Sequence, residues 1–176
     1  MRSSVCRHEV LFILIGTMLL TACLRPNPSD QNMQSTFRSH FKEFDQLREM
    51  IAHDSAVQAV FLDYTVPSIN EACRRGFSRP RWQVYRQYLQ RTHVRGIFRS
   101  DNAIIFEASV FGLGLHGSYK GYMYTSSQPK RLESNLDDAS GGDCGYILRS
   151  LPRAAWYLYL RDCTSDSKEI LHGSPK

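Results

Sequence analysis

Three glycines near the middle of the chain have a spacing that can hold a phosphate group. Gly112, Gly114 and Gly117 form the pattern G-x-G-x-x-G within FGLGLHGSYKG. A dinucleotide site needs a strand before the glycines and a helix after them, because the helix N-terminus binds the pyrophosphate. The residues after Gly117 alternate as in a strand, and Lys120 does not complete a Gly-Lys-Ser/Thr phosphate loop. The pattern therefore predicts a glycine-rich turn that joins two strands.

Other residues of catalytic type lack the neighbours that their chemistry requires. Residues 127–130 and 165–168 match S-x-x-K, but the penicillin-binding reaction also needs a Lys-Thr-Gly strand, which the sequence does not contain. Cys144 and His116 are a nucleophile and a base that nothing in the sequence brings together. His40 falls on the apolar side of a predicted helix, and no histidine stands at zinc-finger spacing from a cysteine. We expect no catalytic site, no metal site and no cofactor.

The whole chain has a net charge of +5 at pH 7, and its arginines are concentrated in one part of the sequence. Between Glu71 and Asp101 there are eight arginines and no acidic residue. Arginine binds anions through forked, charge-assisted hydrogen bonds. We expect a contact with an anionic lipid, an envelope polymer or a protein partner, and not with nucleic acid. The residues assigned to it are Arg79, Arg86, Arg91 and Arg95. The alternative is a solvated basic face whose aromatic neighbours only fill the core.

The N-terminal residues have the pattern of an export signal. Arg2 and Arg7 precede an apolar run from Val10 to Leu20, and small residues follow it. A signal peptide has a charged start, an apolar run of about 7–15 residues and a small-residue cleavage site. The run is shorter than the roughly 20 apolar residues that a membrane-spanning helix needs. The segment is therefore expected to direct export.

The residues that end this segment, Leu20-Thr21-Ala22-Cys23, resemble the lipobox of bacterial lipoproteins. The resemblance implies that residues 1–22 are a lipoprotein signal peptide, and that Cys23 carries a diacylglyceryl group and an acylated amino terminus, for instance with palmitate. Several acyl chains hold a protein on a membrane far better than one. Leu24, where inner-membrane lipoproteins have Asp, implies the outer membrane, with the domain facing the periplasm. The alternatives are an ordinary secretory signal with Cys23 unmodified and an uncleaved anchor.

Three cysteines follow Cys23, namely Cys73, Cys144 and Cys163. In an oxidising envelope compartment, three cysteines predict one disulfide and one unpaired thiol. Their spacing does not choose among the three pairings.

The period of the apolar residues predicts the elements of the first half. Residues 23–34 contain two prolines and no apolar period, so we expect a tether. Ser35 or Thr36 caps a helix, and Ser78 caps a second one that has Pro80 in its first turn. A strand is predicted over 56–69. The apolar side consists of Phe37, Phe41, Phe44, Leu47 and Ile51 in the first helix, and of Trp82, Val84, Tyr85, Tyr88 and Leu89 in the second.

After Gly96 the apolar period changes from that of a helix to that of a strand. Alternation predicts strands over 103–111, 119–125, 145–149 and 155–161, and the last two form a hairpin. Helices followed by consecutive strands indicate an α+β fold, with two amphipathic helices packed on an antiparallel sheet of about four or five strands. Residues 35–163 are expected to form a single domain, and residues 164–176 a flexible tail.

The body of the chain resembles a group of small uncharacterised bacterial envelope proteins. The residues that carry the resemblance are Lys120-Gly121-Tyr122 and Trp156-Tyr157-Leu158-Tyr159, and it implies no activity. We expect a lipid-anchored envelope protein with a binding or assembly role and without a catalytic site. A small hydrolase or transferase acting on envelope polymers is one alternative, and a periplasmic inhibitor or immunity-like partner is another.

Overall fold

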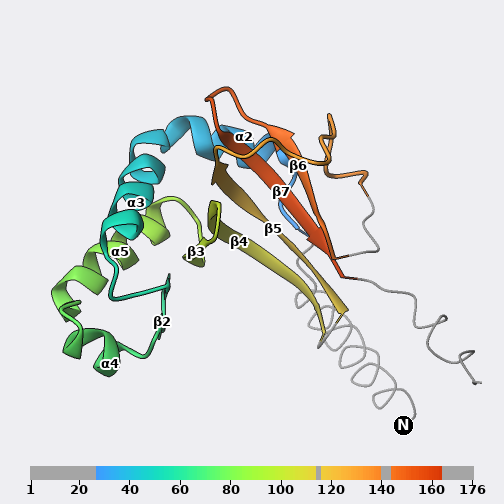
Figure 1. The fold of residues 1–176 in the computed structure, drawn as a ribbon. Coiled ribbons are helices and arrows are strands. Elements are labelled where there is room, and N and C mark those ends of the chain that lie inside the picture. Colours follow the sequence, from blue (N-terminus) through green and yellow to red (C-terminus); the bar gives the residue numbers. More distant parts are fainter. Residues whose placement is uncertain (1–26, 114–115, 140–143, 164–176) are drawn as a thin grey trace, which may run out of the picture.

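The computed structural model describes residues 27–113, 116–139 and 144–163 of the chain, and they form an α+β fold, as predicted (Figure 1). Within them, four helices accompany one seven-stranded antiparallel sheet, where the sequence predicts two helices and four or five strands. The strand order is β2-β1-β3-β4-β5-β7-β6. The helices are α2 (Asp30–Ser39), α3 (Phe41–His53), α4 (Ile69–Arg74) and α5 (Arg79–Arg91); the strands are β1 (Ala59–Phe61), β2 (Thr65–Val66), β3 (Gly96–Ser100), β4 (Ala103–Leu113), β5 (His116–Thr125), β6 (Tyr146–Ser150) and β7 (Trp156–Asp162).

The first predicted helix is two helices, α2 and α3, separated at His40. α2 begins at Asp30, because the side chain of Ser29 accepts a hydrogen bond from the N–H of Asn32 and caps it. Residues 30–34, expected in the tether, therefore belong to the folded domain. Asp30 and Met33 are each only 2 % exposed, and these contacts extend the helix toward the N-terminus.

Aromatic side chains form the centre of the core between α2, α3 and the sheet. The ring centroids of Phe37 and Trp156 are 5.2 Å apart, and those of Phe44 and Tyr122 are 4.5 Å apart. Phe106 completes this group, 5.3 Å from Trp156. The predicted apolar side is confirmed, since most of its members are buried and Phe41 packs against them. Aromatic pairs at these distances add to the stabilisation that burial provides.

α5 begins as predicted, with the side chain of Ser78 accepting from the N–H of Arg81 and with Pro80 in the first turn. Tyr85 and Leu89 are buried, but Val84, predicted on the same side, is 36 % exposed. It lies about 100° round the helix from Tyr85, which turns it toward solvent. The single strand predicted over 56–69 is a hairpin of β1 and β2, which α4 follows.

The glycine-rich stretch joins two antiparallel strands, as predicted, and no helix follows it. β4 and β5 pair along their length, with Gly112 opposite Gly117, and a bulge lies between Glu107 and Ser109. Gly112 has a backbone φ of 125°, which residues other than glycine rarely adopt. Strand β5 is an interior strand of the sheet, since it also pairs with β7.

The C-terminal strands β6 and β7 form the predicted hairpin. A disulfide joins Cys144, before β6, to Cys163, after β7, whereas Cys73 is free and exposed. This selects one of the three pairings that the sequence left open. The predicted signal peptide, Cys23 and the tail over 164–176 lie outside the described residues. Of the helices that are described, none is long and apolar enough to cross a membrane.

Candidate functional site

Residues 27–29 lie across the β4–β5 hairpin before α2 begins. The side chain of Asn27 joins both strands, because its amide nitrogen donates to Oγ of Ser118 at 2.6 Å and its oxygen accepts from Oγ of Ser109 at 2.8 Å. These partners are 91 and 82 residues away along the chain. Two cavities lie beside this segment, one containing Pro28 in its wall and the other Asn27 and Ser29.

The first, which we call the α2 cavity, has a volume of about 440 Å³. Its wall comes from Pro28, from α2, from the residues between α5 and β3, and from β4 and β5; it includes Met33, Ala108, Val110, Tyr122, His93 and Arg95. The hydroxyl of Tyr122 donates to the carbonyl of Met33 at 3.1 Å. The cavity is therefore mostly apolar with a cationic group in its wall, which suits a ligand with an apolar part and a negative charge.

Arg95 also acts on a carboxyl group that the sequence did not single out. Burial holds the pKa of Glu107 above its ordinary value, and the positive charge of Arg95 offsets part of this rise. The two residues are joined by the backbone as well, since the N–H of Arg95 donates to the carbonyl of Glu107 at 2.7 Å. The positive charge of Arg95 therefore interacts with the carboxyl group of Glu107 as well as with the cavity.

The second cavity, which we call the Lys120 cavity, has a volume of about 450 Å³ and is lined by Lys120, Asp137, Ser118 and Phe111, among others. Lys120 is only 2 % exposed, yet its Nζ lies 2.7 Å from Oδ1 of Asp30 and 2.5 Å from Oδ1 of Asp137. Asp30 is equally buried, and its Oδ2 lies 2.7 Å from Nη1 of Arg149. Two cations and two carboxylates therefore form one ion network, in which Lys120 and Asp30 are buried while Arg149 and Asp137 are partly exposed.

Backbone groups complete this ion network. The N–H of Leu136 donates to Oδ2 of Asp30 at 2.8 Å, and the N–H of Asp30 donates to the carboxylate of Asp137 at 3.0 Å. Burial alone would raise the pKa of Asp30, but the bonds from Leu136, Lys120 and Arg149 hold it below its ordinary value. The network ties the start of α2 to β5, β6 and the loop that contains Asp137.

This arrangement positions α2 and offers little for catalysis. The ammonium of Lys120 is committed to two carboxylates, so it occupies the place where a metal cation or a substrate ammonium would bind. Across residues 27–113, 116–139 and 144–163, no group of three His, Cys, Asp or Glu side chains could hold a metal ion. Cys144 is part of the disulfide and has no free thiol. His40 lies between α2 and α3, with its ring centroid 6.5 Å from that of His93.

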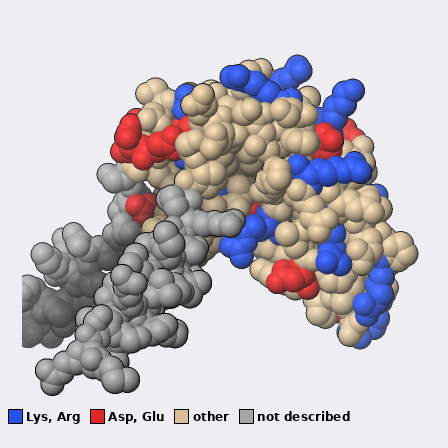
Figure 2. Space-filling model, turned by 180° about the vertical axis from the view of Figure 1, so that it is seen from behind, with Lys and Arg blue, Asp and Glu red and all other residues tan. Residues whose placement is uncertain are grey.

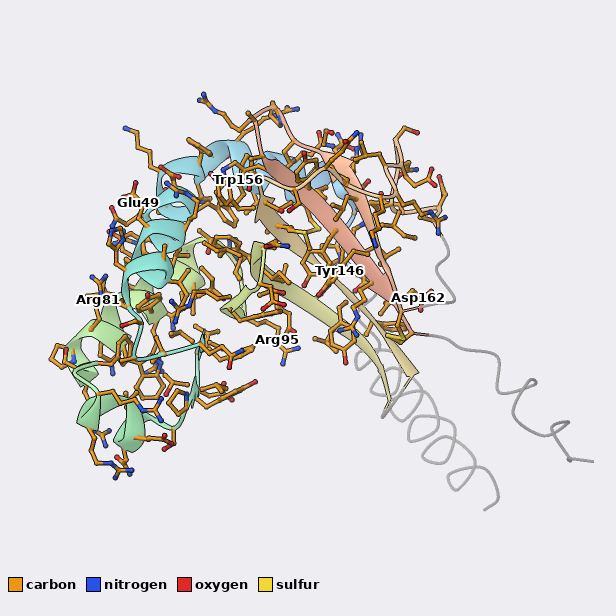
Figure 3. All side chains as sticks on the ribbon, in the orientation of Figure 1. Glu49, Arg81, Arg95, Tyr146, Trp156 and Asp162 are labelled. Atoms are coloured by element: carbon orange, nitrogen blue, oxygen red, sulfur yellow. A yellow bond between two sulfur atoms is a disulfide. The ribbon has the colours of Figure 1, made fainter. Side chains whose placement is uncertain are left out.

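The four arginines assigned to an anionic surface are not brought to one point. Arg79 is exposed at the start of α5, where its Nη2 donates a hydrogen bond to Oδ1 of Asn70. Arg86 lies about two turns further along the helix and is half-buried over the ring of Trp82. Arg91 is exposed over the ring of Tyr88 at the end of the helix. Arg95 directly precedes β3, and Figure 3 shows it well apart from Arg81 on α5. On the face drawn in Figure 2, basic side chains form several groups with uncharged residues between them.

Three of the other four arginines of this region have partners within the domain. Arg75 pairs with Glu71, Arg81 lies 2.8 Å from Oδ2 of Asp54, and Arg99 donates to the carbonyl of Val57. Tyr85 donates to the same carboxylate oxygen of Asp54 at 2.8 Å. Burial is the first cause of the raised pKa of Tyr85, and the carboxylate of Asp54 raises it further. These three arginines therefore serve the fold.

Sequence reasoning missed the Lys120 ion network. No partner is predicted for Lys120 from the sequence, although Lys120, Tyr122 and Tyr124 are spaced by two residues and therefore share the inward side of β5. An inward lysine in a strand requires a buried carboxylate partner, which is the signal that could have revealed the network.

Comparison with protein-family models, with curated proteins and with solved structures finds no match to this chain.

Proposed function

We propose that the protein is a lipid-anchored binding or assembly protein of the bacterial envelope, attached through Cys23 to the outer membrane and facing the periplasm. The lipobox-like residues Leu20-Thr21-Ala22-Cys23 support the anchor. The two cavities and the exposed arginines support a binding role, because they offer space and positive charge. A hydrolase or transferase of envelope polymers would also need a nucleophile and a base in contact.

One observation carries the proposal: Asn27 is hydrogen-bonded to both strands of the β4–β5 hairpin. Only residues 24–26 then separate the folded domain from the lipidated cysteine. A tether of this length keeps the α2 cavity and the Lys120 cavity close to the membrane surface. The ligand or partner of the domain is therefore one that is found at that surface.

The arginine contact is part of this proposal. Its partner is anionic lipid first, with an anionic envelope polymer or a protein partner as alternatives. Three of the assigned arginines lie along α5, and none of them has a carboxylate partner among the ion pairs of the described residues: Arg79, Arg86 and Arg91. Their side chains are therefore available to an anionic partner. Arg95 is supported by its place in the wall of the α2 cavity. An arginine near an anionic membrane surface contributes about 1 kcal/mol to binding.

Labelling with a fatty acid in growing bacteria tests the anchor. The unchanged protein and a Cys73→Ala variant should both incorporate the label, because Cys73 is a free, exposed cysteine that the proposal leaves unmodified. A Cys23→Ala variant should incorporate none and should keep its N-terminal segment. Label that persists in Cys23→Ala, or that disappears in Cys73→Ala, contradicts the proposed anchor.

A further inference from the structure

The hairpin that holds Asn27 has a fixed maximum distance from the proposed lipid. This step rests on the proposed anchor at Cys23. Four residue steps lead from Cys23 to Asn27. A fully extended chain covers at most about 3.3–3.6 Å per residue, so the Cα atom of Asn27 lies within about 14 Å of that of Cys23. The ion network of Asp30 and Lys120 fixes the start of α2 on the sheet, so unwinding α2 to lengthen this connection would break buried ion pairs.

The part of the hairpin within this reach exposes apolar side chains. Phe111 is directly opposite Ser118 in the ladder, and Ser118 is the residue that Asn27 contacts. Opposite Cα atoms of an antiparallel pair are about 4.5–5.5 Å apart. Phe111 is 39 % exposed at the Lys120 cavity, and its neighbour Val110 is 38 % exposed at the α2 cavity.

We infer that this part of the hairpin, with Val110 and Phe111, lies in the interface of the membrane leaflet that holds the lipid anchor. The length of the connection favours the leaflet over any other occupant, because Phe111 lies opposite Ser118, the residue that Asn27 contacts, and therefore stays within a short distance of the anchor. Val110 and Phe111 point to opposite faces of β4, so both meet the leaflet when this end of the hairpin enters it. A second contact made by a tethered domain is intramolecular and needs little affinity of its own. Apolar side chains of a peripheral protein enter about 5–10 Å into the boundary between headgroups and acyl chains.

Charged groups limit how deep this contact is. Asp162 lies opposite Ser118 on the other side of β5, and Asp137 is 37 % exposed in the Lys120 cavity. Neither carboxylate gains from leaving water. The contact is therefore shallow and confined to the exposed side chains of β4, while β7 and the loop with Asp137 stay among the headgroups.

A fluorescent probe at position 111 tests this orientation in the full-length, lipidated protein. In a Cys73→Ser background, Phe111→Cys is labelled with an environment-sensitive maleimide dye. The protein is then reconstituted into vesicles of phosphatidylethanolamine and phosphatidylglycerol, with and without brominated phosphatidylcholine. The matched control is Val66→Cys in the same background, because Val66 is a similarly exposed apolar residue, at 41 %, on the edge strand β2 and outside the proposed arginine contact.

Flotation of the vesicles separates the anchor from the orientation. Co-flotation, a blue-shifted emission at position 111 and quenching there by the brominated lipid, with neither change at position 66, are the expected results. Protein that floats but shows no bromine quenching at position 111 overturns the inference and leaves the anchor intact; a blue shift without quenching would indicate contact with another protein copy. Protein that does not float overturns the proposed anchor.

Discussion

Replacing Lys120 with methionine removes the cation at the centre of the ion network and keeps most of its apolar volume. Nζ of Lys120 lies 2.7 Å from Oδ1 of Asp30, a residue that is 2 % exposed. Breaking a buried ion pair by removing one partner costs about 3–5 kcal/mol, because the other charge stays buried. Asp30 keeps Arg149 and the N–H of Leu136, and Asp137 is open enough to regain water. We therefore expect a loss at the lower end, about 3 kcal/mol.

Urea unfolding of a soluble form that begins at Leu24 measures this loss. Trp156 is 3 % exposed in the core, so its fluorescence reports on unfolding. Lys130→Met is the matched control, because Lys130 is exposed and the change should cost less than about 0.5 kcal/mol. The double variant Asp30→Asn/Lys120→Met removes both charges, and should lose less than the two single variants together by about 0.5–3 kcal/mol.

Two results would refute this reasoning. The first is a Lys120→Met variant that is as stable as the Lys130→Met control. The second is strict additivity of Asp30→Asn and Lys120→Met, since side chains in direct contact cannot act independently.

Three further predictions concern the arginines, the cysteines and the pH dependence. A soluble form changed to glutamine at the four arginines assigned above (Arg79, Arg86, Arg91, Arg95) should sediment less with anionic vesicles at low salt, whereas the matched change at Arg38, Lys42, Lys130 and Arg131 should not; equal sedimentation of the two variants would mean that the assigned arginines are only solvated. Alkylation of the unfolded soluble form should add one group without reductant, at Cys73, and three groups after reduction; three groups without reductant would contradict the disulfide. Loss of the Cys144–Cys163 bridge should lower the free energy of unfolding by about 3 kcal/mol. The pKa of Asp30 is lowered in the folded protein, so its contribution to stability is present above its ordinary pKa of 3.8 and is lost as the pH falls through the lowered value. The Asp30→Asn variant should lose this part of the pH dependence. If the slope of stability against pH below about 4 is unchanged in that variant, the carboxyl group of Asp30 is not responsible.

Local signals in the sequence predicted the elements that depend on local chemistry. Ser78 and Pro80 define the start of α5 within one turn, and alternation on both sides of the glycines defines the β4–β5 hairpin. The start of α2 has a local signal as well, since Ser29 is its N-cap. That signal alone does not place residues 30–34 in the folded domain. Their burial depends on contacts of Asp30 with Leu136 and Arg149, which are 106 and 119 residues further along the chain, and such contacts leave no period in the local sequence.

The candidate site was predicted in part for the same reason. The excess of arginine after Glu71 is visible in the sequence, but which of them remain available depends on Asp54 and Val57, which lie on other elements. The disulfide pairing depends on the register of β6 and β7, which brings residues 144 and 163 together. The inward position of Lys120 was readable from alternation alone, and a search for inward charges in strands would have found it.

The contacts of Asn27 also set an order of events in the maturation of the chain. Its partners Ser109 and Ser118 are 82 and 91 residues later, so both strands must be synthesised and paired before Asn27 can dock. Contacts between such distant residues form late, because a long loop has to close first. Under the anchor proposed above, the interval before docking is the time in which lipid-attaching enzymes would reach Cys23 most easily. After docking, only residues 24–26 would separate the folded domain from the proposed lipid site.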